Sequence, residues 1–282
     1  MDEVRHTWQA AASRWLRETK HKADHKADRG KLRWLEKYLS VYYVDQITRD
    51  VVEAVIAAKL REAGPSTVNR YLALIRAILR KARDDWEWIV KVPRIRMLKE
   101  PPARVRWLPP EDAVRLLYEL PPHLRSMAVF ALSTGLRQSN VTGLRWDQVD
   151  LVRGMAWIHA AQSKNRKAFP VPLNADAQTI LLSLCGEHDE WVFTYNGRPV
   201  SRTSTRAWKL AKERAGITDF RWHDLRHTWA SWHAQNGTGM RELMELGSWS
   251  TVQMVLRYAH LGGDHLIAPA RRIEGLLTSA RR

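Results

Sequence analysis

The stretch His223-Asp224-Leu225-Arg226-His227-Thr228 decides the fold of this chain once two other phrases are set beside it. Those phrases are Thr134-Gly135-Leu136-Arg137-Gln138-Ser139-Asn140 and Arg257-Tyr258-Ala259-His260-Leu261. Cleavage of a phosphodiester by a side chain needs a nucleophile, cationic donors for the non-bridging oxygens and an acid for the departing hydroxyl. Two arginines, a histidine and a late tyrosine supply such parts. The sequence has no obvious cluster of Asp and Glu with metal-ligand character, so we predict metal-free chemistry without a cofactor.

Positive charge is spread along the whole chain. Lys and Arg outnumber Asp and Glu by 46 to 30, which gives +16 over 282 residues. Residues 1–106 hold 24 basic and 14 acidic side chains, and residues 107–282 hold 22 and 16. Basic surfaces on both halves suit a polyanion gripped between them, because neutralising phosphates releases counterions. Charge alone fits a merely soluble cationic protein equally well.

Cysteine usage and hydropathy predict a cytoplasmic protein with no membrane partner. Cys185 is the single cysteine, so it has no intrachain disulfide partner, and a reducing compartment suits it. No apolar run approaches the roughly 18 residues of a membrane span. Asp2, Glu3 and Arg5 precede any apolar stretch, which argues against a signal peptide.

Residues 1–92 have helical periodicity. Apolar side chains recur at helical spacing over residues 8–15, 32–39, 48–60 and 66–79, with Thr48 and Ser66 as candidate N-caps. Four amphipathic helices predict a four-helix bundle.

Residues 93–106 form a basic linker interrupted by prolines. A stretch with few acids between two basic domains is a candidate to cross a nucleic-acid backbone, although a solvated connector has the same composition. The candidate DNA-binding cations are Arg94, Arg96, Lys99, Arg104 and Arg106.

Residues 107–282 predict a second, mostly helical domain with a small antiparallel β-sheet. Short segments rich in branched and aromatic residues occupy 149–151, 155–159 and 168–171, and a basic hairpin tip over 163–167 lies between the last two. Helices precede this sheet and return from Ala175 to the end. The fold class is therefore mainly α, of the α+β kind.

The three phrases, in order and with a lysine-bearing hairpin between the first and the second, resemble the tyrosine recombinases of the phage-integrase family. The resemblance extends over most of the chain: residues 1–92 resemble the core-DNA-binding domain, and residues from 107 onward resemble the catalytic domain. It implies a bacterial or phage-encoded, site-specific recombinase that cuts, exchanges and religates DNA at attachment sites.

Carried over by position, the resemblance makes Tyr258 the nucleophile that forms a 3′-phosphotyrosyl bond. Arg137 and Arg226 would clamp the scissile phosphate, because a guanidinium fork matches its oxygens and stays charged. Taken singly, Tyr258 would be an ordinary half-buried tyrosine. Arg137 would cap a helix or pair with an acid, and Arg226 and His223 would be surface charges.

The resemblance assigns the remaining roles as well. Lys164 would protonate the departing 5′ oxygen, and its neighbours Arg166 and Lys167 are candidate DNA contacts. His223 would hydrogen-bond the phosphate or accept the tyrosine proton. Trp249 stands where many members have a histidine and would donate through its indole nitrogen, although packing is the simpler role for one of 14 tryptophans.

One position departs from the family, and two expectations concern assembly. Asn140 replaces an acidic residue, and its amide oxygen could still hold a neighbouring arginine. Apolar residues at helical spacing over 266–277 suggest a tail that docks on a neighbouring protomer, and packing on its own domain is the alternative. Docking on a neighbour suits a homo-tetramer on DNA, with accessory DNA-bending proteins as further candidate partners. No further N-terminal arm-binding domain is visible.

Two other functions share some of these features. A type IB topoisomerase-like enzyme would use the same chemistry to relax DNA, but the bundle-plus-linker layout and the Arg-Tyr-Ala-His phrase argue against it. A non-catalytic DNA-binding protein would not be expected to keep the full set of reactive residues.

Overall fold

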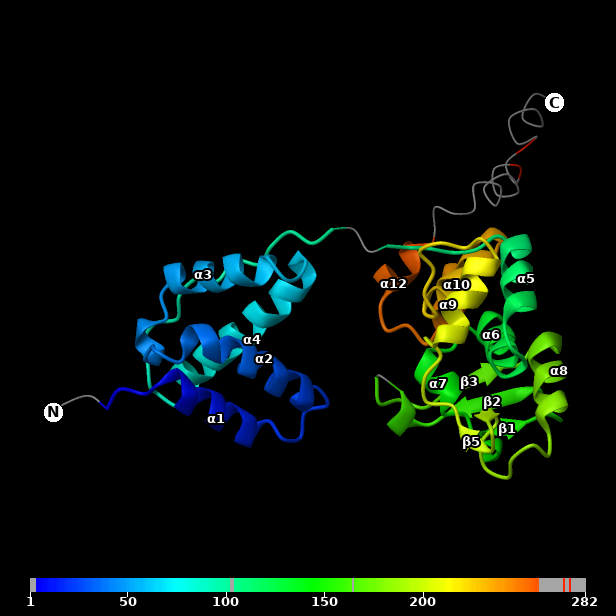
Figure 1. Ribbon diagram of the computed structural model, residues 1–282, viewed down its shortest axis with the longest axis horizontal. Helices are drawn as coiled ribbons and strands as arrows, with labels where there is room; N and C mark the ends of the chain where they lie inside the picture. The colour runs from blue at the N-terminus through cyan, green and yellow to red at the C-terminus, as the bar shows by residue number, and fades with distance from the viewer. Residues whose placement is uncertain (1–3, 102–103, 164, 259–270, 272–273, 275–282) are drawn as a thin grey trace, which may run out of the picture. The chain divides into compact units, whose positions relative to one another are not determined.

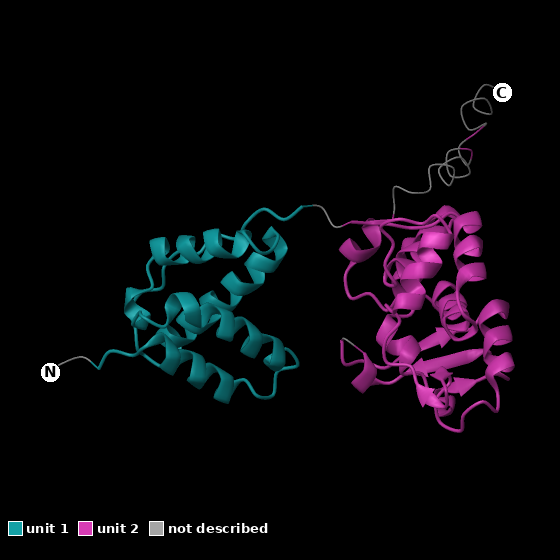
Figure 2. Ribbon diagram, in the orientation of Figure 1, with its two compact units in different colours: residues 1–103 teal, residues 104–282 magenta. Residues whose placement is uncertain are grey.

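The computed structural model describes residues 4–101, 104–163, 165–258, 271 and 274. The chain forms two compact units, residues 1–103 and 104–282 (Figure 2). Helices make up most of both units, and the strands are short and antiparallel, so the predicted mainly α fold is confirmed (Figure 1). No helix among these residues has the length and apolar character needed to cross a membrane.

Unit 1 is built from four amphipathic helices around one apolar core. The helix over 49–60 begins as predicted, with the Thr48 side chain accepting a hydrogen bond from the Val51 backbone N–H. The next helix corrects the sequence prediction, because it begins at Pro65 with Gly64 as its N-cap. Proline suits a first helical position since it lacks only an N–H that would be unpaired there. The helices are α1 (Trp8–Glu18), α2 (His25–Leu39), α3 (Arg49–Leu60) and α4 (Pro65–Asp84), with a 3₁₀ turn η1 (Val44–Gln46).

The segment that follows α4 is packed against unit 1 rather than free. Ile95 is buried in the core of unit 1. The side chain of Asn69 on α4 accepts from the Leu98 backbone N–H at 2.8 Å and donates to the Leu98 carbonyl at 3.0 Å. Residues 95–98 of the predicted linker are therefore anchored on unit 1.

Unit 2 surrounds a three-stranded sheet with helices. The strands β1 (Val149–Asp150), β2 (Met155–Ile158) and β3 (Phe169–Pro172) are antiparallel, with Ala156 paired to Val171. The helices are α5 (Pro110–Glu119), α6 (Pro122–Thr134), α7 (Gln138–Thr142), α8 (Ala175–Leu184), α9 (Arg206–Arg214), α10 (Asp224–Gln235), α11 (Met240–Leu246) and α12 (Val252–Leu256), with 3₁₀ turns η2 (Trp146–Gln148) and η3 (Ala160–Gln162).

A second hairpin in unit 2 was not predicted, since helices were expected throughout after residue 175. Strands β4 (Thr194–Tyr195) and β5 (Arg198–Pro199) pair across the dipeptide Asn196-Gly197. Both turn residues have positive φ, at 50° and 68°. Asn-Gly is a strong signal for such a turn, so the sequence carried the information.

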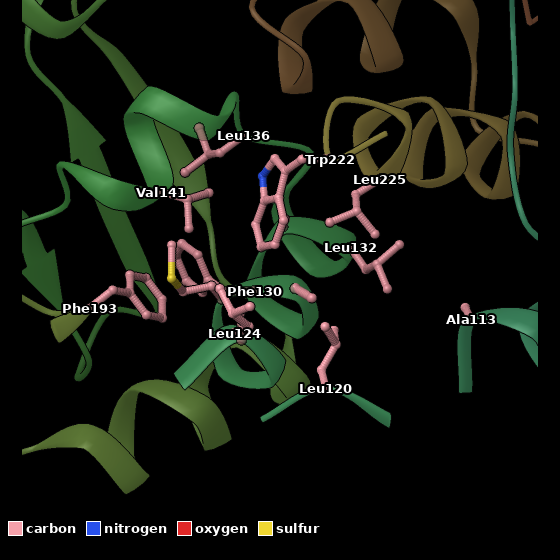
Figure 3. Packing of buried hydrophobic residues seen from close by; sticks show 14 of the residues in the cluster. Ala113, Leu120, Leu124, Phe130, Leu132, Leu136, Val141, Phe193, Trp222 and Leu225 are labelled. Atoms are coloured by element: carbon pink, nitrogen blue, oxygen red, sulfur yellow. The ribbon is translucent and has the colours of Figure 1, made fainter. Parts of the chain in front are cut away.

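The core of unit 2 fixes the helices that carry the site. Phe130 on α6 is buried, and Val141 on α7, Trp222 and Leu225 belong to the same apolar cluster (Figure 3). Trp222 lies just before α10, and Leu225 lies in its first turn. This packing holds the start of α10 against the region where α6 ends and α7 begins.

Candidate active site

Tyr258 is buried in a small cluster formed by the last described helices. It is 2% exposed and packs with Trp229 of α10, Leu243 of α11 and Val255 of α12. Its backbone N–H donates to the Val255 carbonyl at 2.9 Å, which forms a turn directly after α12. The tyrosine ring is therefore held by packing on three helices.

The hydroxyl of Tyr258 makes a hydrogen bond with His227. The distance from Tyr258 Oη to His227 Nδ1 is 2.6 Å. The ring of His223 lies edge-on to that of His227, with the centroids 5.1 Å apart. The Trp249 ring stacks on Tyr258 at 5.6 Å between centroids. Tyr258 is thus in contact with both His227 and the Trp249 indole.

Arg226 is buried beside this cluster and is held by two backbone carbonyls. It is 5% exposed, and its guanidinium donates to the carbonyl of Gly135 at 2.6 Å and to that of Gly247. Glycine is needed at both positions, because a Cβ on Gly135 would collide with the Trp229 ring and one on Gly247 with the Trp249 ring. Gly135 also has a φ of +64°, which few other residues adopt.

The close neighbours of Arg226 are an aromatic ring and another cation. The Trp249 ring covers its guanidinium, with Cζ 4.6 Å from a ring centroid. Burial and the nearby Arg137 guanidinium lower the pKa of Arg226 to about 9. Arg137, half-buried between α6 and α7, has its pKa lowered by burial. Among the residues described, no carboxylate pairs with either arginine.

Burial also shifts the two groups of the hydrogen bond. It raises the pKa of Tyr258 to about 12, against the opposing effect of Arg226 and Arg257. It lowers the pKa of His227 to about 4, with a further contribution from His223. Both groups are therefore neutral at pH 7, and Nδ1 of His227 can accept a hydrogen bond from the Tyr258 hydroxyl in the tautomer that carries the imidazole proton on Nε2.

Most residues predicted for the site lie together. Arg226, Trp249 and Tyr258 are in contact, His223 reaches them through His227, and Arg137 lies close enough to perturb Arg226. Two predicted features cannot be placed in the same way: Lys164 lies outside the described residues, as does the tail over 266–277 except for residues 271 and 274.

Asn140 contacts the hairpin rather than an arginine. Its side-chain N–H donates to the Gln162 carbonyl at 2.9 Å, two residues before Lys164. Gln162 in turn donates to the Gly143 carbonyl at 2.8 Å. These bonds tie α7 to the chain just before the basic tip, on which Arg166 and Lys167 are exposed.

The linker cations fall into two groups. Arg94, Arg96 and Lys99 are exposed on unit 1. Arg104 instead pairs with Asp219 at 2.7 Å and with the buried Asp224 at 3.2 Å, while Arg106 donates to the adjacent Trp107 carbonyl at 3.1 Å. Arg104 therefore has an intramolecular role at the start of α10, in addition to any role toward DNA.

His227 is the residue of this cluster that the sequence interpretation missed. It stands beside Arg226 and four residues after His223, so a helix starting at this phrase places all three on one face. The helical spacing was thus a usable signal. No group of three or more His, Cys, Asp or Glu suited to a metal ion occurs within the described part of the chain.

The chain is similar to phage integrases and tyrosine recombinases. Residues 106–265 match the model of the phage integrase family. The integrase of Salmonella phage P22 is 36% identical, over 96% of this chain and 80% of the phage protein. The tyrosine recombinase XerC of Lactobacillus leichmannii is 29% identical, over 81% of this chain and 83% of that protein.

Two solved structures share the fold. The Tn1549 transposon integrase in complex with transposon right end DNA aligns with a TM-score of 0.79 at 18% identity, covering 93% of this chain and 98% of that chain. A lambda integrase dimer bound to a COC′ core site aligns with a TM-score of 0.75 at 18% identity, covering 93% of this chain and 79% of that one.

Proposed function

The chain belongs to the phage integrase family, and from this premise we propose that Tyr258 is the residue through which it cleaves and rejoins DNA. Members of this family with named activities are integrases and tyrosine recombinases, and this chain is a site-specific recombinase of that kind. The proposal concerns which side chains carry the reaction and how the protein engages its DNA.

The observation that carries the proposal is the position of Tyr258 close to Arg226, which in turn lies near Arg137, with no described carboxylate paired to either arginine. A buried cation is costly unless an anion neutralises it. A phosphodiester bound against Arg226 and Arg137 would supply that anion. The two carbonyls that hold Arg226 leave further N–H donors of its guanidinium for the phosphate oxygens.

The reaction then consists of two exchanges at one phosphorus. Tyr258 Oη attacks the scissile phosphate and forms a 3′-phosphotyrosyl bond, while the bond to the 5′ oxygen breaks. Lys164 protonates that oxygen, and Arg137 and Arg226 stabilise the charge that builds on the non-bridging oxygens. His223 and the Trp249 indole nitrogen donate to the same oxygens. Attack by a 5′-hydroxyl of the partner strand reverses the steps and rejoins the DNA.

DNA contacts would come from both units. Exposed cations lie on unit 1 at Arg94, Arg96 and Lys99, and at the hairpin of unit 2 at Arg166 and Lys167. The Tn1549 and lambda integrases bound to DNA support a DNA partner for this chain. We further propose that the active assembly is a homo-tetramer on two DNA sites, joined through the tail over 266–277 and assisted by DNA-bending proteins.

Trapping on a nicked attachment-site duplex tests the proposal. A nick beside the scissile phosphate releases a short product that diffuses away, so the covalent protein–DNA adduct accumulates. Tyr258→Phe should abolish the adduct while DNA binding persists, because only the attacking oxygen is removed. Tyr195→Phe, which alters an exposed tyrosine of the same unit, is the matched control and should leave the adduct unchanged. An adduct that persists in Tyr258→Phe would assign the nucleophile elsewhere.

A further inference from the structure

The hydrogen bond between Tyr258 and His227 joins the proposed nucleophile to a residue outside the set that the sequence resemblance assigns. We propose that His227 is a catalytic base that takes the Tyr258 proton during DNA cleavage and returns it during rejoining. The proposal rests on Tyr258 being the nucleophile. It gives the proton a destination at a named atom, Nδ1 of His227.

Geometry selects His227 over His223 for this role. Nδ1 of His227 is 2.6 Å from Tyr258 Oη, whereas the described ring contact of His223 is with the His227 ring, at 5.1 Å between centroids. His223 is exposed at the N-terminal cap of α10, while His227 is one turn further into the helix. His223 is thus placed to meet the phosphate, and His227 to meet the tyrosine.

The protonation state of the pair fits a base. The groups that face the imidazole are His223, Asp224, Arg226, Arg257 and Tyr258 itself. Burial is the main cause that lowers the pKa of His227, and His223, Arg226 and Arg257 add to it against the opposing Asp224, so the ring is neutral at pH 7. A neutral ring that accepts at Nδ1 carries its own proton at Nε2. In that tautomer, the lone pair of Nδ1 faces Tyr258 Oη at 2.6 Å and can receive its proton.

The step balances in both directions. As the bond from Tyr258 Oη to phosphorus forms, the phenol proton passes to Nδ1 and leaves an imidazolium ion. In the proposed complex, the scissile phosphate and the negative charge that builds on it would lie beside Arg226, the residue before His227. An adjacent anion favours the charged form of the imidazole. The departing 5′ oxygen takes its proton from the separate acid, Lys164 in the proposed function. On rejoining, the imidazolium returns its proton to the tyrosine oxygen as that oxygen leaves phosphorus.

His227→Asn is the informative variant, because the Asn side chain can place its amide oxygen near the position of Nδ1. That oxygen can accept the Tyr258 hydrogen bond but cannot take up the proton. We expect single-turnover cleavage to slow by roughly a hundredfold or more, the usual contribution of a general base. DNA binding should remain. If His227 only holds the tyrosine in place, His227→Asn should cleave at the rate of the unaltered protein.

His233→Asn is the matched control. His233 lies on the same helix, is partly buried, and has its pKa lowered by burial in the same direction. Its Nδ1 faces the Thr238 hydroxyl at 2.9 Å rather than the tyrosine. Cleavage by His233→Asn should stay within a few-fold of the unaltered protein.

A substrate with sulfur in place of the bridging 5′ oxygen separates the base from the acid. A thiol is a far stronger acid than an alcohol, so its thiolate leaves without protonation. We expect this substrate to restore cleavage by Lys164→Ala but not by His227→Asn. Added imidazole should partly restore His227→Ala, because a free base can then occupy the vacated space.

The outcomes distinguish this inference from the proposed function. If Tyr258→Phe still forms the covalent adduct, the nucleophile itself is wrong. If Tyr258→Phe forms none but His227→Asn cleaves at the normal rate, or is restored by the sulfur substrate, only the assignment of His227 is overturned. Slow cleavage by His227→Asn on both substrates, with normal rates for His233→Asn, supports it.

Discussion

Lys59 in unit 1 and Arg226 in unit 2 are both buried cations, with 7% and 5% of their surfaces exposed. Lys59 pairs with Glu62 at 2.9 Å, and its ammonium group lies over the rings of Trp34 and Tyr71 at 4.3 and 4.6 Å from the centroids. Burial opposes its charge, but hydrogen bonds to Glu62 and Tyr71 outweigh burial and raise the pKa of Lys59.

Arg226 has the opposite surroundings. Two backbone carbonyls and the Trp249 ring contact it, yet its charged neighbour is another cation, Arg137. Burial and that like charge lower its pKa, although an arginine still keeps its charge at neutral pH.

The difference separates a charge that serves the fold from one that serves a ligand. The charge of Lys59 is already paired with Glu62 and covered by two aromatic rings of the same chain, so Lys59 needs no phosphate partner. The environment of Arg226 lacks negative charge among the described residues, and a phosphate would supply it. Burial alone therefore does not identify a functional cation; the sign of the neighbouring charges does.

Removal of each cation should produce the largest contrast. Arg226→Ala should slow DNA cleavage by on the order of a hundredfold to a thousandfold, because a preorganised donor to the transition state is lost. Lys59→Met should leave the cleavage rate within about twofold. Single-turnover cleavage of a nicked site measures both. Equal losses in the two variants would remove the distinction between a structural and a functional cation.

The next contrast concerns stability. Lys59→Ala should lower the free energy of unfolding by about 2 kcal/mol, because the lysine stem packs on two aromatic rings and its ammonium group adds a cation–π contribution. Lys59→Met keeps most of that packing and should cost about 1 kcal/mol or less, since the partner Glu62 is half exposed. Urea unfolding measures both variants. A Met variant as unstable as the Ala variant would make the ion pair, rather than the packing, the main contribution.

The sequence predicted which residues share the site, but not the groups that hold Arg226 in place. The phrases around Arg137, Arg226 and Tyr258 predicted a shared site because residue types and order carry that information. The hydrogen-bond partners of Arg226 could not be predicted from the sequence. Arg226 is held by the carbonyls of Gly135 and Gly247, and backbone groups leave no residue-type signal of their own.

Other parts were missed for identifiable reasons. Arg104 counted as a free linker cation because Asp219 and Asp224, its partners, are distant in sequence. The bond from Asn140 to Gln162 likewise joins residues that only folding brings together. The helical spacing of His223 and His227 and the Asn196-Gly197 turn, in contrast, were local signals that could have been used.

An anion should stabilise one region and not the other. Inorganic phosphate should raise the free energy of unfolding of the unaltered protein by about 1.4 kcal/mol at roughly ten times its dissociation constant, by binding to Arg137 and Arg226. The gain should vanish in Arg226→Ala and persist in Lys59→Met. Thermal unfolding against phosphate concentration at constant ionic strength measures it. A gain that survives Arg226→Ala would place the bound anion elsewhere.

The smallest expected effect is on the titration of His227, which lies next to Arg226. Burial, then His223, and then Arg226 and Arg257 against the opposing Asp224 lower its pKa to about 4. Removing the charge in Arg226→Ala should therefore raise the pKa of His227, though not to its usual 6.5, because burial remains. Lys59→Met should not move it. Histidine NMR signals followed between pH 4 and 8 give the value directly.

The same shift gives a pH dependence of stability with a defined sign. Between the ordinary pKa of 6.5 and the folded value of about 4, the unfolded chain binds a proton at His227 that the folded chain does not, so stability falls as pH falls through this window. His123 and His233, whose pKa values burial also lowers, add to the slope in the same direction. His227→Asn should reduce the loss by about 1 kcal/mol or less, since partial exposure screens the charge. An unchanged slope in His227→Asn would mean that His227 is as easily protonated in the folded protein as in the unfolded chain, and the cationic character of the pocket around Arg226 would then be weaker than its contacts imply.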